Sequence, residues 1–182
     1  RYTAQPVDRP QLERITAAGV SAPSAGNTRG QRLVVVLDPD LRAAIAAAAG
    51  EPDYIERGFA PWVSSAPALI VVGADEAAYR ERYAEPDKAT SQVTDDGVWT
   101  VAWWWVDAGA SLMAMLLAAE DEGLAAGFLG AHACPDVAAI VDVPAGVRFV
   151  GLMTVGHPDT DRRSASLDRA PPDQIRWLDG VS

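Results

Sequence analysis

The segment from Val101 to Glu122 constrains the fold of this chain most strongly. Its residues have helical character and are apolar almost all round, and Gly123 follows as an end signal. A helix of this kind must be covered on every side, so it lies in the centre of a core or in a subunit interface. With 182 residues, of which 49% are hydrophobic, the chain can build a core around such a helix.

The other segments predict one domain in which helices and strands are interleaved. β-Branched apolar runs predict three strong strands, at 32–37, 68–72 and 148–155, and residues 124–129 form a short extended piece. Helices are expected over 10–18, 38–50, 75–83 and 135–141. Because no repeat and no linker-like composition interrupts this order, we expect a single α+β or α/β domain over residues 1–182.

Two polar stretches stand apart from this pattern. Residues 85–98 show no periodicity, and a polar stretch of that length inside a compact domain is typical of a lid or an insertion. Residues 157–182 are expected to form a C-terminal tail that contains Arg162, Arg163 and Arg169. These arginines form either a solvated face or an anchor for an anionic ligand.

The charge balance excludes one broad class of partner. The chain has 25 acidic residues against 15 Lys and Arg, and a formal net charge of -10. Lys88 is the single lysine, so the chain lacks the basic face on which nucleic-acid binding depends. The scarce cations are arginines, whose forked guanidinium suits phosphate and carboxylate groups.

The reactive residue types are few. One cysteine, Cys134, excludes an intrachain disulfide, and with only two histidines a protein-made transition-metal site is not expected. The cysteine usage fits a reducing compartment, so we expect a cytoplasmic protein. No phosphate-binding glycine loop, nucleophile elbow or zinc-protease motif is present, and no apolar run reaches membrane-spanning length.

Two features leave a structural and a functional interpretation open. The loop Ser24-Ala-Gly-Asn27 is either a helix cap and turn or a source of donors and acceptors for a polar planar ligand. Four tryptophans occur within seven residues before and at the start of the long helix: Trp99, Trp103, Trp104 and Trp105. They fill a core and a subunit contact, or some of them, Trp103 and Trp104 in particular, line a pocket for a flat substrate.

Taken in order, four strings of this chain resemble the FMN-dependent nitroreductase family. They are Arg1–Val7, Ala22-Pro-Ser-Ala-Gly-Asn27, the stretch from Val106 through Leu117-Ala-Ala to Glu122-Gly-Leu124, and Thr154-Val-Gly-His-Pro158. None is diagnostic alone, but their order and spacing cover nearly the whole chain. The resemblance implies an α+β fold with a mostly antiparallel central sheet between helix layers, and an intertwined homodimer with FMN at the interface.

The resemblance also implies roles for individual residues. Ser24 and Asn27 are expected to contact the flavin or its ribityl chain, and Arg29 adds a positive charge in place of a more usual glutamine. Leu129, Gly130 and Ala131 are expected to supply backbone contacts beside the reactive flavin nitrogen. Arg169 and Arg1 are the candidate phosphate ligands. The family's Arg-x-Ser-x-Arg phosphate motif is expected immediately upstream of Tyr2, so that only Arg1 of it is seen.

The implied function is an FMN-dependent oxidoreductase. It would use NADH or NADPH to reduce an electron-poor acceptor, such as a nitroaromatic compound or a quinone, in two half-reactions at one site. The flavin carries the chemistry, which explains why no residue is expected to be catalytic by itself. Alternatives are a flavin-storing protein without turnover, a flavin-cleaving enzyme that makes dimethylbenzimidazole, and a structural protein without flavin.

Overall fold

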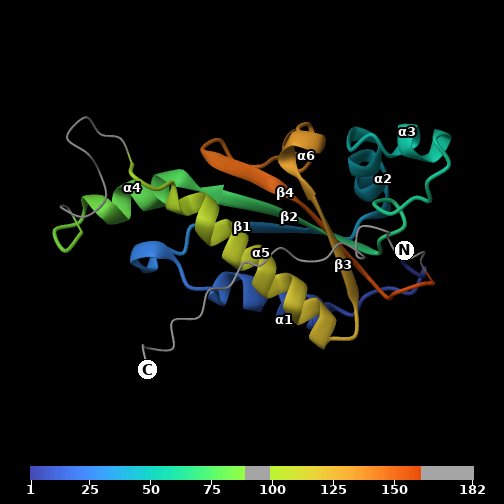
Figure 1. Ribbon diagram of the computed structural model, residues 1–182, viewed down its shortest axis with the longest axis horizontal. Coiled ribbons are helices and arrows are strands. Elements are labelled where there is room, and N and C mark those ends of the chain that lie inside the picture. The colour runs from blue at the N-terminus through green and yellow to red at the C-terminus, as the bar shows by residue number, and fades with distance from the viewer. Residues whose placement is uncertain (89–98, 161–182) are drawn as a thin grey trace, which may run out of the picture.

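The computed structural model describes residues 1–88 and 99–160 and contains a four-stranded sheet between two groups of helices (Figure 1). The elements are, in chain order, α1 (Arg9–Ser21), η1 (Ala25–Asn27), β1 (Gln31–Val36), α2 (Pro39–Ala48), α3 (Glu51–Glu56), β2 (Ala68–Asp75), α4 (Glu76–Ala84), α5 (Trp103–Asp121), β3 (Ala125–Gly130), η2 (Ala131–Ala133), α6 (Val137–Ile140) and β4 (Val147–Gly156).

The sheet has the order β1-β2-β4-β3, and every neighbouring pair is antiparallel. β2 lies in the middle of this sheet and is buried along almost its whole length, as its apolar sequence predicts. Its side chains alternate between the two faces: Ile70 and Val72 join one core cluster, whereas Leu69 and Val71 join another. The sheet therefore positions two cores, one on each face.

Each face is covered by its own helices. α1 and α5 pack side by side on one face, where Ile15 of α1 and Met115 of α5 are fully buried. α2 and α6 contribute to the core on the opposite face, together with the buried residues Val63 and Cys134 (Figure 1). The sequence prediction of an α+β fold is thus confirmed, and the α/β alternative is wrong because every strand pair in the described part of the chain is antiparallel.

The helix predicted to begin after Asp38 and to stop at Gly50 is confirmed. It ends at Ala48, and a second helix, α3, starts at Glu51, because Gly50 between them adopts a left-handed conformation with φ 71°. The buried Glu51 carboxylate then accepts backbone N–H groups from Trp62, Val63 and Ser64, which fixes the chain that returns to β2. The sequence pattern predicted the stop at Gly50 but not α3.

The long helix lies close to its predicted bounds, Val101 and Glu122. α5 begins at Trp103, two residues after the expected start, and the short extended piece is a full strand, β3, paired with β4. Most of the expected lid, residues 89–98, and most of the tail, residues 161–182, lie outside the described residues. Among those described, no helix is long and apolar enough to cross a membrane.

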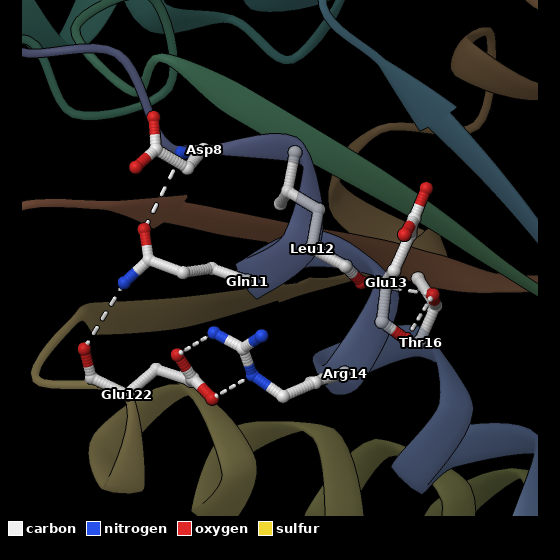
Figure 2. A network of polar contacts seen from close by, with 7 residues as sticks. All are labelled: Asp8, Gln11, Leu12, Glu13, Arg14, Thr16 and Glu122. Atoms are coloured by element: carbon white, nitrogen blue, oxygen red, sulfur yellow. Dashed lines mark hydrogen bonds and ion pairs between the residues drawn. The ribbon is translucent and has the colours of Figure 1, made fainter.

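A polar network fastens the C-terminal end of α5 to the start of α1 (Figure 2). Gln11 accepts from the backbone N–H of Asp8 at 3.3 Å and donates to the backbone carbonyl of Glu122 at 3.2 Å. Arg14 forms a two-pronged ion pair with the Glu122 carboxylate and holds the pKa of Glu122 below its ordinary value. α1 and α5 therefore meet in a fixed register.

We expect Gln11→Ala to lower the free energy of unfolding by about 1–2 kcal/mol, because it removes a helix-capping contact and a bond that joins two helices. Glu13→Ala in the same helix is the matched control, since Glu13 is exposed, and its effect should stay below about 0.5 kcal/mol. Urea unfolding followed by far-UV circular dichroism measures both. Equal losses in the two variants would contradict the proposed role of the network.

Candidate flavin site

α5 has one covered face and one face that its own described chain leaves open. Ala108, Ser111, Met115 and Ala119 are buried against the sheet and α1. On the other side the exposed apolar side chains are Trp105 (45% exposed), Val106 (50%), Met113 (55%) and Leu117 (64%), and Gly109 has open space around it. The sequence predicts that this helix is covered on every side, but the described chain covers only one side of it.

The loop between α1 and β1 places Ser24, Asn27 and Arg29 at one end of this helix layer. Gly26, Asn27 and Arg29 have φ values of 63°, 55° and 55°. Left-handed backbone at Asn27 and Arg29 costs free energy, so it persists only where the surroundings hold it. Asn27 and Arg29 are exposed, and the Arg29 Nε donates to Asn27 Oδ1 at 3.2 Å.

Three contacts hold the loop in this shape. The Ser24 hydroxyl accepts the backbone N–H of Arg29 at 2.9 Å. The Arg82 side chain of α4 donates to the Gly26 carbonyl at 2.9 Å. The backbone N–H of Ala25 donates to Asp107 Oδ2 of α5 at 2.8 Å. The loop is thus tied to itself and to both neighbouring helices.

Asp107 lies at the buried centre of these contacts. It is 5% exposed, and besides Ala25 it accepts the Tyr79 hydroxyl at 2.7 Å. Burial, and then the neighbouring Asp107 carboxylate, raise the pKa of Tyr79 well above its ordinary value. Sequence reasoning did not single out Asp107 as a site residue. Its position as a lone charge inside an otherwise apolar helical run was the available signal.

Trp103 and Trp104, the predicted substrate-pocket residues, belong to the small core around Tyr79. Trp104 is buried and packs edge-on against Tyr79, with ring centroids 6.3 Å apart, and against Trp99 at 5.5 Å. Trp103 is half-buried beside this cluster, and Trp105 points to the open face of α5. Trp104 therefore has the core position of the structural interpretation, and the pocket role of Trp103 stays a prediction.

Leu129 and Gly130 end β3, an edge strand of the sheet, and Ala131 begins the turn η2 that follows. All three are half-buried, and an edge strand presents backbone N–H and C=O groups that its sheet does not pair. Beneath them Cys134 is buried with its sulfur 3.6 Å from the Gly130 carbonyl, and burial raises the pKa of its thiol. That environment favours an inert thiol.

One chain does not bring the two sets of predicted contacts together. The ladder pairs Leu33 with Val72, Val72 with Gly151 and Gly151 with Gly130, so β1 and β3 occupy opposite edges. Three strand spacings separate these edges by about 14 Å. The Ser24–Asn27 loop precedes β1, whereas Leu129–Ala131 ends β3.

The predicted phosphate ligands lie at the chain ends. Residues 1–3 run beside residues 157–159, through a bridge between Tyr2 and Pro158 and a bond from the Asp159 N–H to the Arg1 carbonyl. Arg1 is therefore beside the start of the tail. Arg169 itself, with Arg162 and Arg163, lies outside the described residues.

The donors that the structure presents fit FMN. An isoalloxazine ring offers a polar edge that backbone amides and an asparagine amide can match, and a phosphate suits arginine. The exposed Asn27 and Arg29 and the open edge at Gly130 provide these groups.

Comparison with known proteins agrees with this geometry. The nitroreductase family model matches residues 1–157. The structure of NfrA2 from B. megaterium matches with a TM-score of 0.73 at 22% identity, over 100% of this chain and 70% of that one. An NADPH:FMN oxidoreductase from Vibrio harveyi, complexed with NAD+, gives a TM-score of 0.64 at 24% identity, over 97% and 74%.

An FMN-dependent nitroreductase from Clostridium difficile gives a TM-score of 0.69 at 17% identity, over 97% of this chain and 91% of that one. A search of the curated proteins finds no match. The family match extends over most of the chain, and the fold of the solved structures covers nearly all of it. This chain belongs to the nitroreductase family.

Proposed function

We propose that this protein is an FMN-dependent oxidoreductase that uses NADH or NADPH to reduce an electron-poor acceptor. Membership of the nitroreductase family and the similarity to the NADPH:FMN oxidoreductase and the FMN-dependent nitroreductase support this proposal. The acceptor would be a nitroaromatic compound, a quinone or a related molecule. The two substrates would use one site in turn, in a ping-pong sequence.

One observation carries the proposal: each chain offers two half-sites that it cannot close alone. The Ser24–Asn27 loop and residues Leu129–Ala131 lie at opposite edges of the sheet, and α5 leaves a broad apolar face open. A homodimer that covers α5 would bring the loop of one protomer to the β3 edge of its partner. FMN would then bind between two chains, twice per dimer.

The phosphate end of the cofactor would lie near the chain termini. Arg1, Thr3 and Gln5 alternate as in the Arg-x-Ser-x-Arg motif, with Thr in place of Ser and Gln in place of the second Arg. Because only Arg1 of these three matches the motif, we keep the rest of the phosphate motif upstream of Tyr2 as a prediction and propose Arg1 as its one ligand in this sequence. Because residues 1–3 run beside residues 157–159, Arg1 and the tail that carries Arg169 could hold one phosphate together.

The flavin ring would supply hydride acceptance and donation when bound. The chain would bind and orient it: Ser24 and Asn27 on one side, the backbone of Leu129, Gly130 and Ala131 on the other. Arg29 places an exposed positive charge at the loop. Trp103, half-buried at the head of α5, would line the acceptor pocket, and the buried Trp104 would support it.

The central test is a spectrum of the purified protein, reconstituted with FMN, before and after anaerobic addition of NADH or NADPH. We expect bound flavin absorbance near 450 nm that is bleached by at least one reductant and restored when a quinone is added. Bound flavin that resists both reductants would support the storage alternative. Release of a benzimidazole product in air would support the flavin-cleaving alternative, and failure to bind FMN would contradict all flavin functions.

Arg169→Ala should weaken FMN binding about tenfold or more, because a charge-assisted bond to phosphate is lost. Arg9→Ala is a matched control on the exposed surface of α1 and should leave the affinity unchanged. Quenching of FMN fluorescence during titration gives both dissociation constants. Equal affinities would refute the phosphate assignment.

Leu117→Glu should weaken the dimer, because it places a charge on the open apolar face of α5. Leu41→Glu, at a similarly exposed leucine of α2, is the control and should not change the assembly. Size-exclusion chromatography with light scattering should give twice the 19.2 kDa chain mass for the wild type and the control. A wild type that is monomeric at micromolar concentration would contradict the two-chain site.

A further inference from the structure

We infer that Asp107 is a positioning residue for the proposed flavin site: its buried carboxylate holds the Ser24–Asn27 loop in the conformation that meets the cofactor. The inference rests on the proposed function for its ligand, but its geometry is independent of it. Asp107 itself contacts no proposed ligand group. It acts through the backbone N–H of Ala25, which lies between the two loop residues Ser24 and Gly26.

The loop needs such an anchor because its backbone is not in a relaxed conformation. Asn27 and Arg29, which both carry side chains, have positive φ values, and the turn also contains a left-handed Gly26. Residues in this region cost free energy unless neighbouring contacts compensate. Without a fixed partner the segment would sample other conformations, and FMN would have to order it on binding.

Asp107 is well placed to hold the loop. It lies on α5, whose C-terminal end is fastened to α1 by the Glu122 network, so the carboxylate projects from a rigid element (Figure 2). Its Oδ2 accepts both the Ala25 N–H at 2.8 Å and the Tyr79 hydroxyl at 2.7 Å. Hydrogen bonds to a charged acceptor are about twice as strong as neutral ones.

Tyr79 holds the carboxylate from the other side. Its ring is buried against Trp104 and lies so close to Gly30 that a Cβ at that position would be 2.3 Å from the ring. Tyr79 thus contacts the end of the same loop and donates to the same oxygen of Asp107. One oxygen of Asp107 on α5 thus binds both the loop, through Ala25, and α4, through Tyr79. This double contact distinguishes Asp107 from an ordinary buried polar residue.

The test compares wild type, Asp107→Asn and Asp107→Ala by two independent measurements. In the protein without flavin, amide hydrogen exchange should be faster at Ala25 by about tenfold in Asp107→Ala and by a smaller factor in Asp107→Asn, which keeps a neutral acceptor. In FMN titrations the dissociation constant should rise in the same order, by about tenfold for Ala and about threefold for Asn.

Two control variants separate positioning from a general loss of stability. Asp38→Ala removes another aspartate that accepts two backbone N–H groups, at the start of α2, and should lower stability without changing FMN affinity. Tyr79→Phe removes the second donor to Asp107 but leaves the Ala25 bond, so it should weaken FMN binding less than Asp107→Ala does.

Unchanged exchange at Ala25 in Asp107→Ala, or unchanged FMN affinity in a folded Asp107→Ala, would overturn the inference. If that variant does not fold, the Asp107→Asn protein decides by the same criteria. A wild type that binds no FMN would overturn the proposed function and with it the flavin role of Asp107. In that case, faster amide exchange at Ala25 in Asp107→Ala than in wild type would still support the contact between Asp107 and the loop.

Discussion

The two faces of α5 determine how the rest of this structure is arranged. One face packs on the sheet and α1 through fully buried residues such as Met115, and its buried carboxylate, Asp107, binds the Ser24–Asn27 loop. The other face is apolar and open, with Leu117 and Met113 more than half exposed. Burying such a face on a second chain would be favourable by roughly 25 cal/mol per Å² of apolar surface removed from water.

The fold and the proposed function are linked through this helix. The antiparallel order β1-β2-β4-β3 keeps the loop before β1 and the end of β3 on opposite edges. The same α5 that would join two chains also anchors the loop through Asp107. Association of the chains and the shape of the flavin site would therefore depend on one element, so damage to α5 should affect both.

Local patterns in the sequence predicted the parts that depend on local chemistry. β-Branched runs at 32–37, 68–72 and 148–155 became β1, β2 and β4, and the apolar run became α5. Gly50 signalled the end of α2, but α3 was missed, because its first residue, Glu51, binds a loop eleven or more residues away. Pairings of that range leave no periodic signal.

The sequence proposes residues for the candidate site but not their arrangement in space. The resemblance to the nitroreductase family suggested Ser24, Asn27 and Leu129–Ala131. Only the strand order shows that these residues lie at opposite edges of the sheet. The anchoring role of Asp107 depends on Tyr79 and Ala25, which are 28 and 82 positions away in sequence. Tertiary contacts of this kind require the fold.

Subunit complementation tests most directly whether the flavin site is shared by two chains. One chain carries Asn27→Ala in the loop, and the other carries Ala131→Trp at the β3 edge; each variant dimer alone should bind FMN poorly. In the mixed dimer one site combines both defects and the other combines none. The account predicts that the mixed dimer regains tight binding of one FMN per two chains. Binding no stronger than in the parent variants would contradict it.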